Sequence, residues 1–236
     1  LVGSEMCIRD SCSTSAHGGS IVKGGGDVVD CDGDLSLLDY HELQKNHPSW
    51  VLDLGPGSDV MSKIEFVVNR LRPLDPTLAD RLAAEAAPMI APDNVFWVRN
   101  VELNDVRDEG IVQGSYRCTV RQVATAQTPQ GAHQRFLTIQ QDLWERLSVE
   151  HRAGLILHEM IHKITKENGQ KNSSRARRFV AFVSTTEMER VTQQDYVEFK
   201  SEVFRSPWPV AFQKQKFQLH TPSQVGVPNA RPYVLN

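Results

Sequence analysis

Apolar residues in the first half of the chain recur with helical spacing over one long segment. Between residues 58 and 90 they fall three or four positions apart, as on one face of a helix. The positions are Val60, Ile64, Val67, Val68 and Leu71. Because Pro73 and Pro76 follow, we predict a helical hairpin whose second, alanine-rich helix covers about residues 78–89.

Other segments have the composition and alternation of strands. Residues 95–103, 115–124 and 134–139 are rich in β-branched and aromatic side chains, which favour strands. A shorter strand is expected at residues 27–31, ended by a turn at Asp32-Gly33. We expect the three longer strands to be antiparallel neighbours.

The last third of the chain predicts three helices. The first covers residues 149–167, with Ser148 as N-cap and Asn168-Gly169 as its stop. A second covers residues 174–184, and a capping box at residues 192–195 begins a third that ends near residue 203. Since strands and helices are segregated, we predict an α+β fold: a three- or four-stranded, mostly antiparallel sheet packed on the first of these helices, flanked by the hairpin.

The ends of the chain look different from its centre. Residues 1–11, LVGSEMCIRDS, resemble a translated sequencing adapter, so we expect an artefact there and a natural start that is missing. Residues 12–26 combine small residues ending at Ala16 with a glycine-rich stretch, typical of a signal-peptide remnant and a flexible lead, or of a plain linker. We expect one domain at residues 27–205 and an irregular, proline-bearing tail at 206–236.

The signal-peptide interpretation predicts export, to the periplasm or beyond. In an exported chain Cys31 and Cys118 are the natural disulfide pair and Cys12 leaves with the signal. Three free thiols in a reducing compartment agree equally well with the cysteine count.

Composition excludes two classes of function. The chain of 236 residues carries 26 basic and 29 acidic residues, a formal net charge of -3, which argues against nucleic acid as a partner. No stretch approaches the roughly 18 apolar residues of a membrane span. Oligomeric state is left open by the sequence.

One motif carries chemistry: His158-Glu159-Met160-Ile161-His162, an HExxH pattern in the middle of the predicted helix 149–167. Residues four apart lie on one helical face, so both imidazoles can bind the same Zn²⁺ ion. Glu159 can then act as general base on a water that the metal activates.

The stretch 136–164, a strand followed by the motif helix, resembles the zincin metallopeptidases. The metzincin positions for Gly and a third His are Thr165 and Asn168 here, so the resemblance implies a gluzincin-like site with a glutamate from a following helix. Glu187 is the first candidate for this third metal ligand and Glu189 the second. Glutamates of this kind are usually only solvated.

A broader resemblance covers most of residues 24–185. The segments GGGDVVDC, SLLDYHE, HEMIHKI and NGQKNSSRARRFVAFVS are similar to a group of uncharacterised exported proteobacterial proteins. In that group the position of His162 is not always histidine, so Asn172, Ser173 and Arg175 become candidates for orienting the site, or simply begin a helix. The basic cluster of Lys171, Arg175, Arg177 and Arg178 is expected to be a solvated face that pairs with acids of the next helix.

Two functional hypotheses follow. The first is a zinc-dependent hydrolase acting on a peptide or protein, because no phosphate- or sugar-binding motif accompanies HExxH. The alternative is a catalytically silent, zincin-like exported domain with a binding or structural role in the cell envelope.

Overall fold

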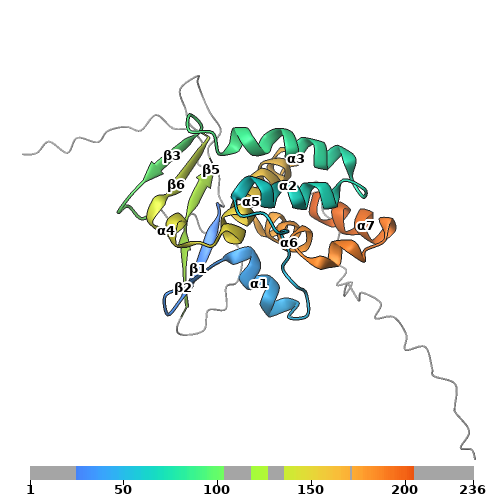
Figure 1. The fold of residues 1–236 in the computed structure, drawn as a ribbon, viewed down its shortest axis with the longest axis horizontal. Helices are drawn as coiled ribbons and strands as arrows, with labels where there is room; N and C mark the ends of the chain where they lie inside the picture. Colours follow the sequence, from blue (N-terminus) through green and yellow to red (C-terminus); the bar gives the residue numbers. More distant parts are fainter. Residues whose placement is uncertain (1–24, 104–117, 127–135, 171, 205–236) are drawn as a thin grey trace, which may run out of the picture.

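The computed structural model describes residues 25–103, 118–126, 136–170 and 172–204. Within these ranges the fold is α+β, with seven α-helices, one 3₁₀ helix and two three-stranded sheets. The strands are β1 (Asp27–Cys31), β2 (Asp34–Leu37), β3 (Val95–Val98), β4 (Cys118–Gln122), β5 (Ala124–Ala126) and β6 (Leu137–Gln140). The helices are α1 (Leu38–Asn46), α2 (Val60–Leu71), α3 (Pro76–Met89), α4 (Gln141–Arg146), α5 (Val149–Glu167), α6 (Ser174–Val183), the 3₁₀ helix η1 (Thr186–Glu189) and α7 (Gln193–Phe204). The strands gather on one side of the molecule and most helices on the other, with α5 between them (Figure 1).

Two small sheets stand where one sheet is predicted. Their strand orders are β2-β1-β4 and β3-β6-β5, and every pairing is antiparallel except β3 with β6. The predicted strand 115–124 divides at Val123 because the amides of Val123 and Ala124 both donate to the carbonyl of Gly26, at 2.9 and 3.1 Å. Two residues opposite one is the pattern of a bulge, which turns the chain from the first sheet into the second.

Helix α5 has the predicted boundaries and lies at the centre of the core. The hydroxyl of Ser148 accepts a hydrogen bond from the amide of His151, and Gly169 ends the helix with φ +83°. Its residues from Ala153 to His162 are all buried, and it packs against α2, α3, α6 and β2. A helix that is buried on every side is usually apolar all round. Helix α5 departs from this rule, because it also buries the polar side chains of His158, Glu159 and His162.

The predicted hairpin of α2 and α3 is confirmed, and it packs on α5. Asp59 and Asp75 cap the two helices by accepting hydrogen bonds from the backbone amides of Ser62 and Leu78.

The predicted capping box at Thr192 and Asp195 begins α7. Helices α1 and α4 were not predicted: each follows a strand with no intervening loop, and neither has a side-chain N-cap.

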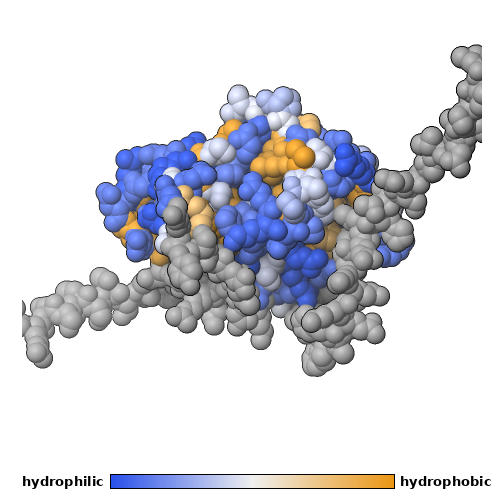
Figure 2. All heavy atoms as spheres, turned by 90° about the horizontal axis from the view of Figure 1, so that it is seen from below, coloured by the Kyte–Doolittle hydropathy of each residue, from blue (hydrophilic) through white to orange (hydrophobic). Residues whose placement is uncertain are grey.

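None of the helices in the described ranges is long and apolar enough to cross a membrane. On the face shown in Figure 2, hydrophobic residues form separate islands between hydrophilic ones.

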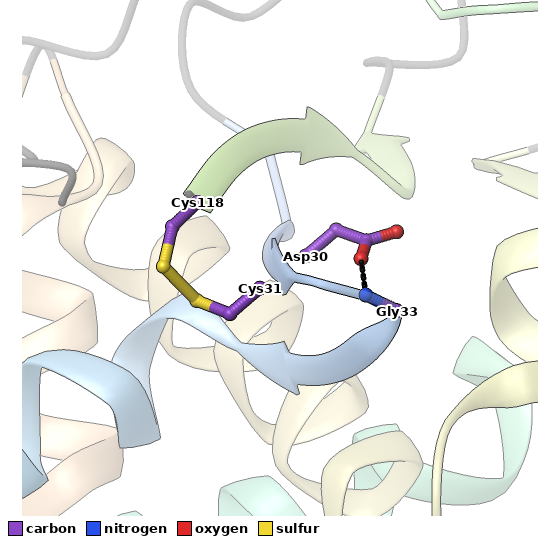
Figure 3. Close-up of a disulfide and its surroundings, with 4 residues drawn as sticks. All are labelled: Asp30, Cys31, Gly33 and Cys118. Carbon is purple, nitrogen blue, oxygen red and sulfur yellow. Dashed lines mark hydrogen bonds between the residues drawn. A yellow bond between two sulfur atoms is a disulfide. The ribbon is translucent and has the colours of Figure 1, made fainter. Parts of the chain in front are cut away.

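The predicted pairing of Cys31 with Cys118 is confirmed. The two cysteines are directly opposite each other in the β1–β4 ladder, with Cα atoms 4.1 Å apart, and they form a disulfide (Figure 3). In the turn between β1 and β2, the Asp30 carboxylate accepts a hydrogen bond from the Gly33 amide (Figure 3). The bridge closes a loop with a sequence separation of 87 residues.

Removing this bridge is expected to destabilise the chain. Replacing both Cys31 and Cys118 by Ser should lower the free energy of unfolding by about 2–4 kcal/mol, because the unfolded chain regains the freedom of a long loop. Urea unfolding measures the loss, and wild-type protein in excess reductant should give the same midpoint as the double variant. Equal midpoints for the oxidised wild type and the double variant would contradict this.

Candidate functional site

The three side chains of the HExxH motif lie together on α5, in the interior of the protein. His158 and Glu159 are fully buried and His162 is 1% exposed. The two imidazole rings lie one helical turn apart, with centroids separated by 5.7 Å and planes at 68°. The structure thus places the predicted pair of histidines next to each other in the interior.

Asp39, in the first turn of α1, holds the ring of His158. Its carboxylate oxygens lie 2.9 and 3.2 Å from Nδ1 of His158, and its side chain is fully buried. Burial disfavours a charged imidazole, but the charge and hydrogen bond of Asp39 outweigh it and raise the pKa of His158 to about 9. With Nδ1 bound to Asp39, Nε2 is the nitrogen that faces away from the carboxylate.

Glu159 is held by the backbone of the segment that precedes β1. Its Oε1 accepts a hydrogen bond of 2.7 Å from the amide of Gly26. Gly25 and Gly26, which are predicted to lie in a flexible lead, are instead buried parts of the fold. A Cβ on Gly26 would lie 1.9 Å from Cδ1 of the buried Leu155, so a larger residue here would force the Leu155 side chain to move. Burial raises the pKa of the Glu159 carboxyl.

A second polar group lies beside the Asp39–His158 pair. Arg177 on α6 is 4% exposed; it donates from Nε to Glu42 at 2.9 Å and from Nη1 to Ser173 at 3.0 Å. The expectation that Arg177 belongs to a solvated face is therefore wrong. Arg178, by contrast, is exposed and pairs with Glu202 of α7, as predicted.

The candidates for orienting the site differ in what they contact. Asn172 accepts hydrogen bonds from the amide and hydroxyl of Ser174, which is the helix-start role that the sequence left open. Ser173 contacts Arg177 instead, and Arg175 is half-buried. Lys171 lies outside the described residues.

The candidate third ligands lie in η1. The carboxylate of Glu187 is 3.3 Å from Arg190, and Glu189 is 60% exposed and 4.0 Å from Arg70. Neither joins the histidines: in the described part of the chain, no group of three or more His, Cys, Asp or Glu side chains is arranged to bind a metal ion.

The donor atoms of the motif nevertheless suit zinc. Among the described residues, neither Nε2 of His158 nor Oε2 of Glu159 has a hydrogen-bond partner, although both atoms are buried. Buried polar atoms are normally satisfied, so such a pair calls for a ligand. In zinc sites, the ring nitrogen of a histidine that does not bind the metal usually donates a hydrogen bond to a carboxylate. Asp39 is placed to accept such a bond from Nδ1 of His158. His158 and His162 would hold the metal through Nε2.

Comparison with known proteins adds no relative: no protein-family model, no curated protein and no solved structure matches the chain.

Sequence reasoning missed two parts of this site. Asp39 lies within an apolar stretch with Leu37, Leu38 and Tyr40, and a carboxylate in such a stretch signals a buried group that needs a partner. Gly26 is predicted to lie in a flexible lead, and no sequence pattern shows that its amide meets a side chain 133 residues later.

A double-mutant cycle on the free energy of unfolding tests the close approach of Gly26 to Leu155. Gly26→Ala should lower the free energy of unfolding by about 1–3 kcal/mol, because its methyl group overpacks against Leu155. In the double variant with Leu155→Ala the total loss should be smaller than the sum of the single losses.

Gly33→Ala is the matched control for this cycle. A Cβ there meets nothing within 4 Å, and its cost comes from φ +94° alone. Its effect should therefore add to that of Leu155→Ala in urea unfolding. Additivity at Gly26 as well would show that the approach is not close.

Proposed function

We propose that this chain is a zinc-dependent hydrolase whose substrate is a peptide or protein. The observation that carries the proposal is the orientation of His158: Asp39 engages Nδ1, and the buried Nε2, like Oε2 of Glu159, has no partner among the described residues. This is the arrangement that a metal-binding histidine and a neighbouring general base require.

The residues of the chain would divide the work as follows. Asp39 accepts a hydrogen bond from Nδ1 of His158 and so orients the ring and raises the basicity of Nε2. Since the pKa of His158 is about 9 without a metal, Nε2 would have to give up its proton for zinc to bind. The amide of Gly26 holds one oxygen of Glu159, so that the other is positioned to take a proton from water. Because burial raises the pKa of Glu159, its carboxylate is a stronger base than an exposed one. When bound, zinc would supply acidification of the water and polarisation of the substrate carbonyl.

The proposal predicts different outcomes for the ligands and the base. Glu159→Gln should retain zinc but lower the hydrolytic rate about 100- to 10,000-fold, because it removes the proton acceptor. His158→Ala and His162→Ala should lose the metal. Elemental analysis of protein purified without chelators, together with peptide-hydrolysis assays, measures both.

His151→Ala is the matched control, since His151 lies on the same helix two turns earlier and outside the motif. It should leave the zinc content unchanged. Wild-type protein with far less than one zinc per chain, or a zinc content that survives the loss of His158, would refute the proposal.

The role of Asp39 has its own test. Asp39→Asn should weaken zinc binding about 10- to 100-fold, because the amide supports the imidazole less well than the carboxylate. Glu42→Gln is the control: it changes a carboxylate on the same helix, one turn later, that pairs with Arg177 instead. Competition with a chelating dye compares the affinities. Equal weakening in both variants would count against a specific role for Asp39.

A second candidate is a catalytically silent domain that binds or supports another component of the cell envelope. Two observations favour it: His158 and Glu159 are fully buried, and one oxygen of Glu159 is already engaged by Gly26. On this account the polar side chains of α5 only join α1 and the β1 segment to the core. A folded, zinc-free wild type is its expected result in the elemental analysis.

We also propose that the chain acts outside the cytoplasm, in the periplasm or beyond. The disulfide between Cys31 and Cys118 supports this location, since such bonds persist in oxidising compartments. Recovery of the natural upstream sequence tests it: an apolar signal core is expected, and its absence would contradict export.

A further inference from the structure

A pocket of about 210 Å³ lies among α1, α6 and α7, and it is separate from the motif on α5. Apolar and aromatic side chains form much of its wall: Leu43, His47, Trp50, Ala181, Phe182 and Phe199. Asp39 also lines it. Because Asp39 bonds Nδ1 of His158, the pocket lies behind this imidazole, away from the Nε2 side that the metal proposal uses.

The rings of the wall contact one another in a continuous row. His47 stacks on Trp50 with centroids 4.2 Å apart and planes at 17°. Trp50 and Phe182 are 5.9 Å apart, and Phe182 and Phe199 are 4.6 Å apart, both pairs being tilted. Rows of this kind offer both faces and edges to a further ring, which gains from aromatic contact as well as from burial.

The charged groups of the wall are already engaged with protein partners. Asp39 bonds His158, Glu42 pairs with Arg177, and Arg178 contacts both Glu202 and the ring of Phe199. Asp195 accepts a hydrogen bond from the hydroxyl of Thr192. Burial and the charge of Arg178 lower the pKa of His47, which is therefore neutral near pH 7. Four of these groups, Asp39, Glu42, Arg177 and Arg178, are paired with an opposite charge, and Asp195 has a neutral hydroxyl as its partner. An anionic ligand would find no uncompensated cation here and a cationic ligand only Asp195, so the wall favours a neutral ligand.

The volume sets the size of the ligand. A dry apolar cavity of about 150 Å³ binds benzene. A pocket of about 210 Å³ therefore accepts a somewhat larger ring system. We propose that this pocket is a binding site for a neutral, planar aromatic group about the size of indole, either as a small molecule or as part of one. The proposal is independent of zinc and of hydrolysis.

Calorimetric titration of the full chain with indole tests the site, with benzoate and benzylamine as anionic and cationic probes of similar chemistry. Indole should bind saturably at one per chain, and at least tenfold more tightly than either charged probe.

Ala181→Phe should fill the pocket and weaken indole binding at least tenfold. Val197→Phe is the matched control, because Val197 lies on α7 with 48% exposure and does not line the pocket. It should bind indole as the wild type does. Circular dichroism establishes that each variant is folded. If Ala181→Phe does not fold, Phe182→Leu keeps the wall apolar but removes a ring, and it too should weaken binding.

Any of three results would overturn the proposal. The first is that the folded wild type shows no saturable binding of indole, and the second is that it binds a charged probe as tightly as indole or more tightly. The third result is indole binding that is unchanged in both Ala181→Phe and Phe182→Leu. A self-association of the chain that Ala181→Phe abolishes and indole does not affect would instead show that a second copy occupies the pocket.

Discussion

The structure depends on one buried ion pair, between Asp39 at the start of α1 and His158 in the middle of α5. A carboxylate that is withdrawn from water without a partner costs several kcal/mol, so Asp39 is stable in the core only where it meets a donor. His158 supplies this donor and gains a raised pKa in return. The pair thereby ties the start of α1 to the central helix, although the two residues are 119 positions apart.

The constraint extends to everything that touches this pair. On one side, Arg177 and Glu42 join α6 to α1 beside it, with the guanidinium close enough to oppose the protonation of His158. On the other, Gly26 brings the segment before β1 against Glu159. A small polar network thus lies within the apolar core, and such networks are stable only when each member has a partner. The atoms that lack one among the described residues are the natural place to look for a ligand.

The elements with strong local signals could be predicted from the sequence. Helix α5 has a good N-cap in Ser148, a glycine stop and a long apolar pattern, and its boundaries agree with the prediction. The hairpin of α2 and α3 likewise follows from spacing and prolines. Helix α1 could not be predicted in this way, because its first turn contains a buried carboxylate and no side chain caps it. The division of β4 from β5 depends on the carbonyl of Gly26, which no nearby residue reveals.

By itself, the sequence determined the α+β class, the placement of His158, Glu159 and His162 on one helix, and the pairing of Cys31 with Cys118 as one of its open alternatives. These follow from local spacing and from the count of cysteines. Only the tertiary structure decided that Asp39, Gly26 and Arg177 surround the motif, and that Glu187 contacts Arg190. The physical reason is that partners of a buried polar group are chosen by packing across the core, and the residues that meet there are far apart in the chain.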